Sequence, residues 1–219
     1  MRLLNEVQIF ERLCAEEEKD RLIVTPIIDA RQQFQPASVD LRLGTEFRTF
    51  RITRFEFLDI LQDTEKAKLA LQEYAEDHEL TYKGKFVLHP GDFALAMTLE
   101  YIRLPADLAG RLEGKSTWGR LGLQVHSTAG FVDPGFEGCL TFELINAGKV
   151  PIPLYPGLRV AQICFYEIEE TGIPYSKKVS SLYGGRPNLI DSRFYTMKEV
   201  EFLRPLHRTT PDQPTDKDH

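Results

Sequence analysis

The chain has 219 residues, of which 42% are hydrophobic and 27% are charged. A chain of this size and composition can form a packed core without disulfides or a structural metal ion. The formal net charge of −6 argues against a general affinity for nucleic acid, because DNA and RNA binding requires a basic face. A small anionic ligand can still bind in a local pocket of arginine and lysine side chains.

The three cysteines, Cys14, Cys139 and Cys164, are scattered and have no C-x-x-C spacing. This pattern predicts reduced, mostly buried thiols in a reducing compartment. Residues 1–6 include no apolar stretch of signal-peptide length, and no segment is apolar over the length that spans a bilayer. We therefore expect a cytoplasmic protein that binds neither membranes nor nucleic acids.

Residues 1–60 predict a short helix followed by extended segments. Asn5 is a suitable N-cap, and apolar residues then recur at helical spacing until the acidic run 16–18. Polar and apolar residues alternate in segments 22–26 and 38–43, and the aromatic-rich stretch 45–60 can continue as strands. The apolar helical positions are Val7, Ile9, Phe10, Leu13 and Cys14.

From Leu61 to about Glu79 the pattern changes to apolar residues among Glu, Lys and Gln, which are good helix formers. We interpret residues 61–80 as a helical insertion. After Gly84, short apolar runs alternate with Gly and Pro turns, which indicates an all-β sandwich or barrel. We expect one domain over residues 1–208 and a disordered polar tail over residues 209–219. The predicted strands are 86–88, 93–99, 101–104, 139–145, 151–155 and 159–168.

The first group of candidate functional residues lies at residues 111–122. The Gly-Lys-Ser-Thr run at 114–117 is similar to the end of a P-loop, but Ala109 stands where a P-loop needs a glycine, so we reject that motif. Such a run at the start of a helical turn still presents amides and small donors to an anion, and Lys115 and Arg120 add positive charge. The alternative is a capped surface turn with solvated cations.

A second group of candidates follows at residues 126–138. Asp133 lies before a Pro-Gly turn and can accept a hydrogen bond from a sugar hydroxyl, although Asp is also a common turn starter in this context. Phe136 is either a core residue or a flat wall for a sugar or a base. Gly130 and Gly135 allow the backbone to approach a ligand closely.

Glu143 is the third candidate, because it is a carboxylate among Phe142, Leu144 and Ile145 in a predicted strand. In a strand it shares a face with Thr141. Burying a charge is costly, and buried carboxylates have raised pKa values that suit proton transfer near neutral pH. The alternative is that Glu143 faces water or pairs with a structural arginine.

These groups, in this order and spacing, resemble the dCTP deaminase family. The resemblance extends from about Gln35 to Glu167, interrupted by the insertion, and it is specific because several motifs agree. The motifs are Gln-Pro-Ala-Ser-Val-Asp-Leu-Arg-Leu at 35–43, His-Pro-Gly at 89–91, Glu-Gly-Lys-Ser-Thr-Trp-Gly-Arg-Leu-Gly-Leu at 113–123, His-Ser-Thr-Ala-Gly-Phe-Val-Asp-Pro-Gly-Phe at 126–136, Thr-Phe-Glu at 141–143 and Tyr-Pro-Gly at 155–157.

The resemblance implies a distorted jelly-roll, dUTPase-like β-fold, assembled as a homotrimer with the nucleotide between neighbouring subunits. The implied reaction is hydrolytic deamination of dCTP at cytosine C4, which gives dUTP and ammonia. Mg²⁺ would enter with the triphosphate. Zinc-dependent nucleobase deaminases need a His-x-Glu and a Pro-Cys-x-x-Cys motif, and the sequence has neither, so we expect no zinc and no metal bound by protein ligands.

The resemblance also implies roles for individual residues. Glu143 would be the general base and acid, while Ser116 and Arg120 would position the attacking water and stabilise the tetrahedral centre. Asp133 would bind the 3′-hydroxyl group, and Phe136 would help to exclude a 2′-hydroxyl group. The other implied substrate-binding residues are Lys115, Thr117, Trp118 and Gly119, which would hold phosphates, and Thr141 and Phe142, whose backbone would read the base.

The family's C-terminal arm closes over the triphosphate with a tyrosine, a lysine and a glutamine. Tyr175 matches the tyrosine, but Leu182 stands at the lysine position and the glutamine position falls near Arg186. Lys177, Lys178 or Arg186 can substitute as cations. The chain therefore departs from the family's pattern in this arm.

Some relatives also cleave dUTP to dUMP and pyrophosphate, and they resemble this chain in the Gly130-Phe131 pair, where pure deaminases often carry bulkier residues. In such enzymes Asp133 would help to activate a second water. The rival interpretations are a dUTPase, a non-catalytic nucleotide-binding regulator on the same fold, and an interaction module. Glu143 favours the deaminase, because a dUTPase has no use for a glutamate beside the base.

Overall fold

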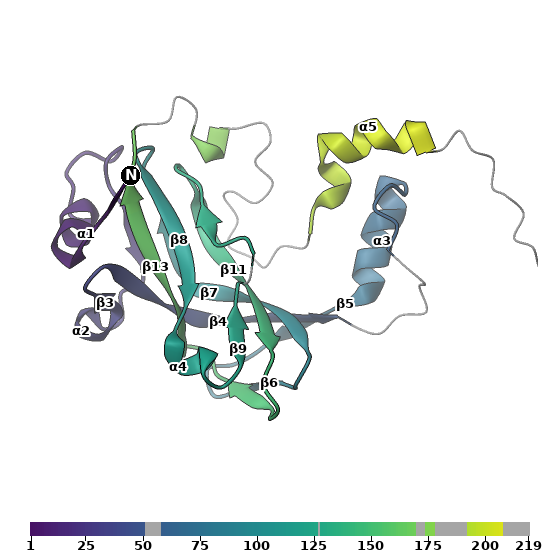
Figure 1. Ribbon diagram of the computed structural model, residues 1–219, viewed down its shortest axis with the longest axis horizontal. Coiled ribbons are helices and arrows are strands. Elements are labelled where there is room, and N and C mark those ends of the chain that lie inside the picture. The colour runs from purple at the N-terminus through teal and green to yellow at the C-terminus, as the bar shows by residue number, and fades with distance from the viewer. Residues whose placement is uncertain (51–57, 127, 170–173, 178–191, 208–219) are drawn as a thin grey trace, which may run out of the picture. The chain divides into compact units, whose positions relative to one another are not determined.

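The structure is a computed structural model that describes residues 1–50, 58–126, 128–169, 174–177 and 192–207. Its central element is a long strand, β4 (Ser38–Phe50). The first half of β4 pairs with β13 (Arg159–Glu167), and the second half pairs with β7 (Phe93–Arg103). Because β4 has a different partner along each half, it joins the two halves of one curled sheet (Figure 1).

Within the described residues the sheet has 11 strands, and neighbours along its main path are antiparallel. The path runs β10-β8-β13-β4-β7-β11-β9, while β1 pairs with β13, β2 with β7, and β3 and β5 with β4. Strands β6 and β12 form a separate pair. The remaining bounds are β1 (Arg2–Leu3), β2 (Ile23–Thr25), β3 (Phe34–Gln35), β5 (Ala75–Glu79), β6 (Phe86–Leu88), β8 (Leu108–Gly114), β9 (Leu123–Val125), β10 (Phe131–Val132), β11 (Glu137–Asn146) and β12 (Ile152–Leu154).

The predicted opening helix is confirmed as α1 (Glu6–Leu13). Asn5 caps it, because its side chain accepts from the Gln8 amide while the Gln8 side chain accepts from the Asn5 amide. Of its apolar positions, Ile9 is buried, whereas Val7 and Phe10 are exposed. The other helices are α2 (Ala30–Gln33), α3 (Thr64–Tyr74), α4 (Ser116–Gly119) and α5 (Lys198–His207), with short 3₁₀ helices η1 (Tyr175–Lys177) and η2 (Phe194–Thr196).

The hydrophobic core lies between the inward faces of the long strands. Leu41, Phe47, Phe142 and Phe165 are among its largest fully buried side chains. Along β11, buried and half-buried residues alternate without interruption, as expected for a strand with one face on the core. Burial of this apolar surface is the main force that stabilises the sheet.

The first half of β4 is buried on both faces, over the seven consecutive residues 38–44. Val39, Leu41 and Leu43 belong to the hydrophobic core. The opposite face of the strand carries Asp40 and Arg42, which are also buried. Since a buried charge is costly unless it is paired, both residues require partners from other elements.

Arg42 finds its partner in Glu100, which lies on β7 and is fully buried. The Arg42 guanidinium lies 3.1 Å from one Glu100 oxygen, and the Arg42 backbone amide donates to the other at 2.8 Å. The Gln33 side chain donates to the same carboxylate at 3.0 Å. Burial raises the pKa of Glu100 above its ordinary value, although the hydrogen bonds from Arg42 act in the opposite direction.

The chain divides into two compact units. The first consists of Met1–Phe50 and Asp77–Ile190, and the second consists of Arg51–Glu76 and Asp191–His219. Within the second unit, α3 and α5 are joined by hydrogen bonds from Arg204 to the Leu61 carbonyl (3.1 Å) and to the Thr64 hydroxyl (3.3 Å). A single domain over residues 1–208 stays a prediction, and the tail 209–219 lies outside the described residues.

The all-β fold with a short N-terminal helix and a helical insertion is confirmed, but two boundaries were wrong and some elements were missed. The helix of the insertion ends at Tyr74, and residues 75–79 form β5, where Asp77 and His78 bond to Arg48 and Thr49 on β4. Segments 93–99 and 101–104 form one strand. Strand β8 and helix α5 were not predicted, and the sequence of β8 shows no clean alternation of polar and apolar residues.

The three cysteines are free, but the prediction that they are mostly buried was wrong. Cys14 is exposed, while Cys139 and Cys164 are half-buried. Desolvation raises the pKa of both half-buried thiols, so they are weaker acids than an ordinary cysteine. No helix in the described part of the chain is both long enough and apolar enough to cross a bilayer.

The raised pKa of Glu100 makes a prediction about stability. The folded chain keeps this proton at pH values where the unfolded chain has lost it, so its contribution to stability is largest at low pH and declines as the pH rises through the raised pKa. Glu100→Gln cannot titrate. The free energy of unfolding of the parent chain minus that of the variant should increase as the pH falls from about 7 to about 5, as measured by urea unfolding.

Glu65→Gln serves as the control, because Glu65 is an exposed carboxylate on α3 that pairs with Lys68. The difference in the free energy of unfolding between the parent chain and Glu65→Gln should not increase as the pH falls, unlike the difference for Glu100→Gln. A difference for Glu100→Gln that shrinks as the pH falls would contradict the raised pKa.

Candidate active site

Residues 115–120 form a tight turn between β8 and β9, which we call the 115–120 turn. Its backbone closes through hydrogen bonds from the Gly119 amide to the Lys115 carbonyl (3.1 Å) and from the Arg120 amide to the Ser116 carbonyl (3.0 Å). Ser116 and Arg120 are exposed, as is Thr117, whereas Lys115 is half-buried. The turn follows a strand of an antiparallel sheet, so the P-loop remains rejected.

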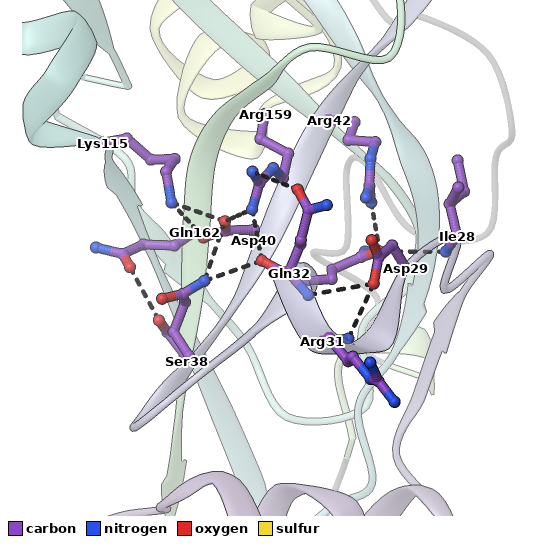
Figure 2. A network of polar contacts seen from close by, with 12 residues as sticks. Ile28, Asp29, Arg31, Gln32, Ser38, Asp40, Arg42, Lys115, Arg159 and Gln162 are labelled. Atoms are coloured by element: carbon purple, nitrogen blue, oxygen red, sulfur yellow. Dashed lines mark hydrogen bonds and ion pairs between the residues drawn. The ribbon is translucent and has the colours of Figure 1, made fainter.

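The first residue of the turn is attached to the buried face of β4. The Lys115 amine lies 2.6 and 2.7 Å from the two carboxylate oxygens of Asp40, whose side chain is fully buried. Arg159 on β13 contacts the same carboxylate at 3.0 Å. Figure 2 shows the two cations converging on Asp40 from different elements. Asp40 therefore gains the two positive charges that its burial requires.

The far end of the turn is fixed by close backbone packing. Gly122 has φ 94°, and a Cβ atom there would lie 2.4 Å from the Gly148 amide nitrogen, so only glycine fits. The Ala147 amide donates to the Gly122 carbonyl at 2.8 Å. Asn146 is fully buried and holds this neighbouring turn, because its side chain accepts from Gly148 and donates to the Leu88 carbonyl, both at 2.9 Å.

A hollow of about 410 Å³ lies beside the 115–120 turn. This volume falls in the range of small-molecule sites. Glu143 is not among the residues that line it in the single chain. The lining residues are Gly114, Lys115, Ser116, Gly119, Leu123, Gln124 and Val125.

Glu143 lies on the outward face of β11, where it is half-buried. It shares that face with Thr141 and Cys139, as predicted, but Phe142 and Leu144 point the other way into the core. Of the apolar neighbours in sequence, Ile145 alone is on its face. The expectation of a carboxylate surrounded by apolar strand residues was therefore wrong in part, because alternation separates Glu143 from two of them.

Strand β9 connects Glu143 with the 115–120 turn. It begins shortly after Arg120 and pairs with the last residues of β11, from Leu144 to Asn146. The next hydrogen bond runs from the His126 amide to the Glu143 carbonyl at 3.0 Å. His126 has φ 62°, which is unusual for a residue other than glycine. Two candidate groups that are distant in sequence are thus attached to opposite ends of one short strand.

The backbone of Thr141 and Phe142 lies beside an open edge. Both residues pair with β7 on one side of β11. On the other side, β9 pairs only from Leu144 onward, and no described strand runs along residues 137–142. The Phe142 side chain is fully buried in the core. Any contact between these two residues and a ligand base must therefore involve the backbone or the Thr141 side chain.

The third candidate group gathers at the turn of residues 133–136. Asp133 is exposed, and its carbonyl accepts from the Phe136 amide at 3.1 Å, so it starts a turn as expected. Phe136 is only 8% exposed, and its ring lies 6.2 Å from that of Tyr175. The Tyr175 amide donates to the Pro134 carbonyl at 2.8 Å. The structure thus brings Asp133, Phe136 and Tyr175 together, while Arg186 lies outside the described residues.

A model of the dCTP deaminase-like family matches residues 9–168, which include the 115–120 turn, Asp133 and Glu143. The chain belongs to the dCTP deaminase-like family. The match ends before Tyr175, so the departure of the C-terminal arm from the family's pattern lies outside the matched region.

Named relatives agree with this assignment to the dCTP deaminase-like family. A protein of Dictyoglomus thermophilum named "dCTP deaminase, dUMP-forming" is 44% identical over 177 residues, which cover 80% of this chain and 88% of that protein. A protein of Mycobacterium ulcerans with the same name is 45% identical over 185 residues, which cover 84% and 93% of the two chains.

A solved structure in the dCTP deaminase-like family confirms the predicted fold. The 2′-deoxycytidine 5′-triphosphate deaminase from Agrobacterium tumefaciens has a TM-score of 0.55 and 25% identity. The similarity covers 75% of this chain and 48% of that one, so this chain spans about half the length of the solved chain.

The residues that hold the candidate site in place were not predicted from the sequence. Asp40 and Arg159 bind the start of the 115–120 turn, and Asn146 supports its end. A signal for Asp40 was present, because it is a charged residue between Val39 and Leu41 in a strand. Among the described residues, no group of three or more His, Cys, Asp or Glu side chains is placed to hold a metal ion.

The close packing of Gly135 against Pro174 and Tyr175 predicts that a larger residue at position 135 destabilises the fold. Gly135 has φ 76°, and a Cβ atom there would lie 2.4 Å from the Pro174 Cβ atom and 3.0 Å from the Tyr175 amide nitrogen. Gly135→Ala should lower the free energy of unfolding by about 2–4 kcal/mol, because it adds a clash to the cost of a left-handed backbone. Urea unfolding measures this loss.

Gly91→Ala is the matched control. Gly91 has a similar φ of 85°, but nothing lies within 4 Å of its Cβ position. Its loss should be limited to about 1–2 kcal/mol. Equal losses for the two variants would show that Pro174 does not dock on Gly135.

Proposed function

We propose that the chain hydrolyses dCTP to dUTP and ammonia and continues to dUMP and pyrophosphate, as part of pyrimidine deoxynucleotide metabolism. One observation carries this proposal. A half-buried carboxylate, Glu143, lies next to the end of β9, and the exposed Ser116 and Arg120 precede the start of the same strand. The family assignment and the names of the relatives support the same reaction.

In the proposed mechanism, Glu143 takes a proton from a water molecule as its oxygen attacks cytosine C4. Ser116 and Arg120 position that water and stabilise the tetrahedral centre, as preorganised donors do. Glu143 delivers that proton to ring N3 and then moves the proton of the new C4 hydroxyl group to the amino nitrogen. The bond between C4 and the amino nitrogen breaks, the C4 carbonyl forms and ammonia leaves. The sequence has no motif of the zinc deaminases, so the water is activated by the carboxylate in this proposal.

The remaining candidate residues are assigned to nucleotide binding. Asp133 would accept from the 3′-hydroxyl group, and Phe136 would form a wall that leaves no room for a 2′-hydroxyl group. The open backbone edge at Thr141 and Phe142 would read the base. The phosphates, which carry Mg²⁺ into the site, would bind to Thr117, Trp118 and Gly119 of the turn and to Tyr175 and Arg186 of the arm.

We also propose that the active enzyme is a homotrimer with sites between its subunits. The hollow beside Ser116 is not lined by Glu143 of the same chain, which is expected where the site is completed by a neighbour. The cytoplasm is the proposed compartment, because free thiols are typical of reducing surroundings.

The second proposed step, cleavage of dUTP, depends on Asp133. The exposed Asp133 would help to activate a water that attacks the triphosphate. The relatives named "dUMP-forming" support this step. The presence of glycine at position 130 also has a structural reason, because a Cβ atom there would lie 2.8 Å from the Leu112 carbonyl oxygen. A bulkier residue at this position would push β10 away from β8.

Product analysis tests both steps at once. The parent chain, mixed with Mg²⁺ and dCTP, should release ammonia and pyrophosphate in equal amounts and accumulate dUMP. Release of ammonia without pyrophosphate would support the deamination of dCTP and reject the second step, the cleavage of dUTP. Pyrophosphate from dUTP without ammonia from dCTP would indicate a dUTPase, and tight dCTP binding without turnover would indicate a regulator.

Glu143→Gln tests the proposed proton transfer. The variant should lose ammonia release by about 10²-fold or more, because the amide cannot accept a proton, while its affinity for dCTP remains within about threefold. Calorimetric titration with dCTP and an ammonia assay measure the two quantities. Glu137→Gln is the control, because Glu137 is half-buried on the same face of β11. Near-normal ammonia release from Glu143→Gln would reject the assignment.

A further inference from the structure

Most of the 115–120 turn is exposed, although Trp118 packs partly against the hydrophobic core and the Lys115 amide donates to the Val160 carbonyl at 3.1 Å. Ser116, Thr117, Gly119 and Arg120 are all exposed. Exposed groups on a single helical turn are free to move unless their neighbours are fixed, and reaction rates are sensitive to small displacements of catalytic groups. Something at the ends of the turn must therefore determine where Ser116 and Arg120 lie.

Two side chains anchor the turn to the same place in the sheet. The Lys115 amine contacts both oxygens of Asp40, at 2.6 and 2.7 Å. The Trp118 ring nitrogen donates to the Arg159 carbonyl oxygen at 2.8 Å. The Arg159 side chain contacts Asp40 at 3.0 Å, so both anchors end on one pair of residues (Figure 2).

The geometry also defines what the Lys115 amine can do. Asp40 is fully buried, whereas the side chains of Lys115 and Arg159 are 24% and 32% exposed. Asp40 cannot reach water if Lys115 leaves it, so the ion pair is costly to separate. Gln35 also donates to Asp40, at 3.4 Å, but it carries no charge. The Lys115 amine is therefore bound to the sheet and is not a freely available phosphate ligand.

We propose that Asp40 and Arg159 are positioning residues for the reaction, and that Lys115 acts through Asp40. The ion pair holds the residue directly before Ser116, and the Trp118 hydrogen bond holds the turn two residues before Arg120. This inference rests on the proposed deaminase function for its kinetic consequences. Its structural part, that Asp40 keeps the turn in place, does not depend on the substrate.

A double-mutant cycle tests the coupling between the two residues. Asp40→Asn, Lys115→Met and the double variant are compared with the parent chain by ammonia release from dCTP, at a temperature where circular dichroism shows all four to be folded. Each single variant should lower kcat by about tenfold or more and change KM by less than about threefold. The double variant should be no slower than the slower single variant, because the second change removes nothing further.

Lys149→Met is the matched control, since Lys149 is an exposed lysine outside the turn. It should keep the parent values of kcat and KM. Multiplied losses in the double variant, or a rise in KM with unchanged kcat in Lys115→Met, would overturn the proposal and restore Lys115 as a direct phosphate ligand. If Asp40→Asn does not fold, Lys115→Met decides the question through this same division between kcat and KM.

Trp118 provides a second measurement that needs no activity. It is the single tryptophan of the chain, so fluorescence excited selectively from tryptophan reports on the turn alone. Asp40→Asn and Lys115→Met should each increase the quenching of this fluorescence by acrylamide, while Lys149→Met should not. Unchanged quenching in Lys115→Met would overturn the positioning role. Absence of ammonia release from the parent chain would instead reject the deaminase, and the fluorescence result would still stand.

Discussion

The structure depends on one constraint, which is that the first half of β4 is buried on both faces while one of those faces carries charges. Asp40 and Arg42 cannot be solvated there, so each must meet an opposite charge from another part of the chain. Arg42 meets Glu100 of β7, and Asp40 meets Arg159 of β13. The two ion pairs connect β4 to β7 and β13, two of the strands that pair with it, and they favour the register in which the charges match.

The same constraint extends from the fold to the candidate site. Asp40 also pairs with Lys115, so part of the positive charge that the buried Asp40 requires comes from the 115–120 turn, most of which is exposed. The opposite end of the turn is fixed by the contact of Gly122 with Gly148, supported by the buried Asn146. The exposed residues of the turn are thus held at both ends by buried neighbours.

Family membership and the structure contribute different parts of the functional argument. The family match identifies the family, and the matched region includes Glu143 and the turn that carries Ser116. The structure explains why the chemistry is placed where it is. Alternation along β11 turns Glu143 outward and Phe142 inward, and the early end of the pairing with β9 leaves a backbone edge open. The site is therefore assembled on strand ends, where the regular pairing of the sheet stops.

The sequence by itself determined the fold class, the helices at α1 and α3, the turn at residues 115–120 and the common face of Glu143 and Thr141, because these features follow from local periodicity, capping and the family's motifs. Only the tertiary structure decided that residues 75–79 form a strand, that Asp40 binds Lys115, and that Phe136 packs against Tyr175. These features join residues far apart in the chain. A local pattern cannot identify such partners, because a buried charge requires a counter-charge without specifying which residue supplies it.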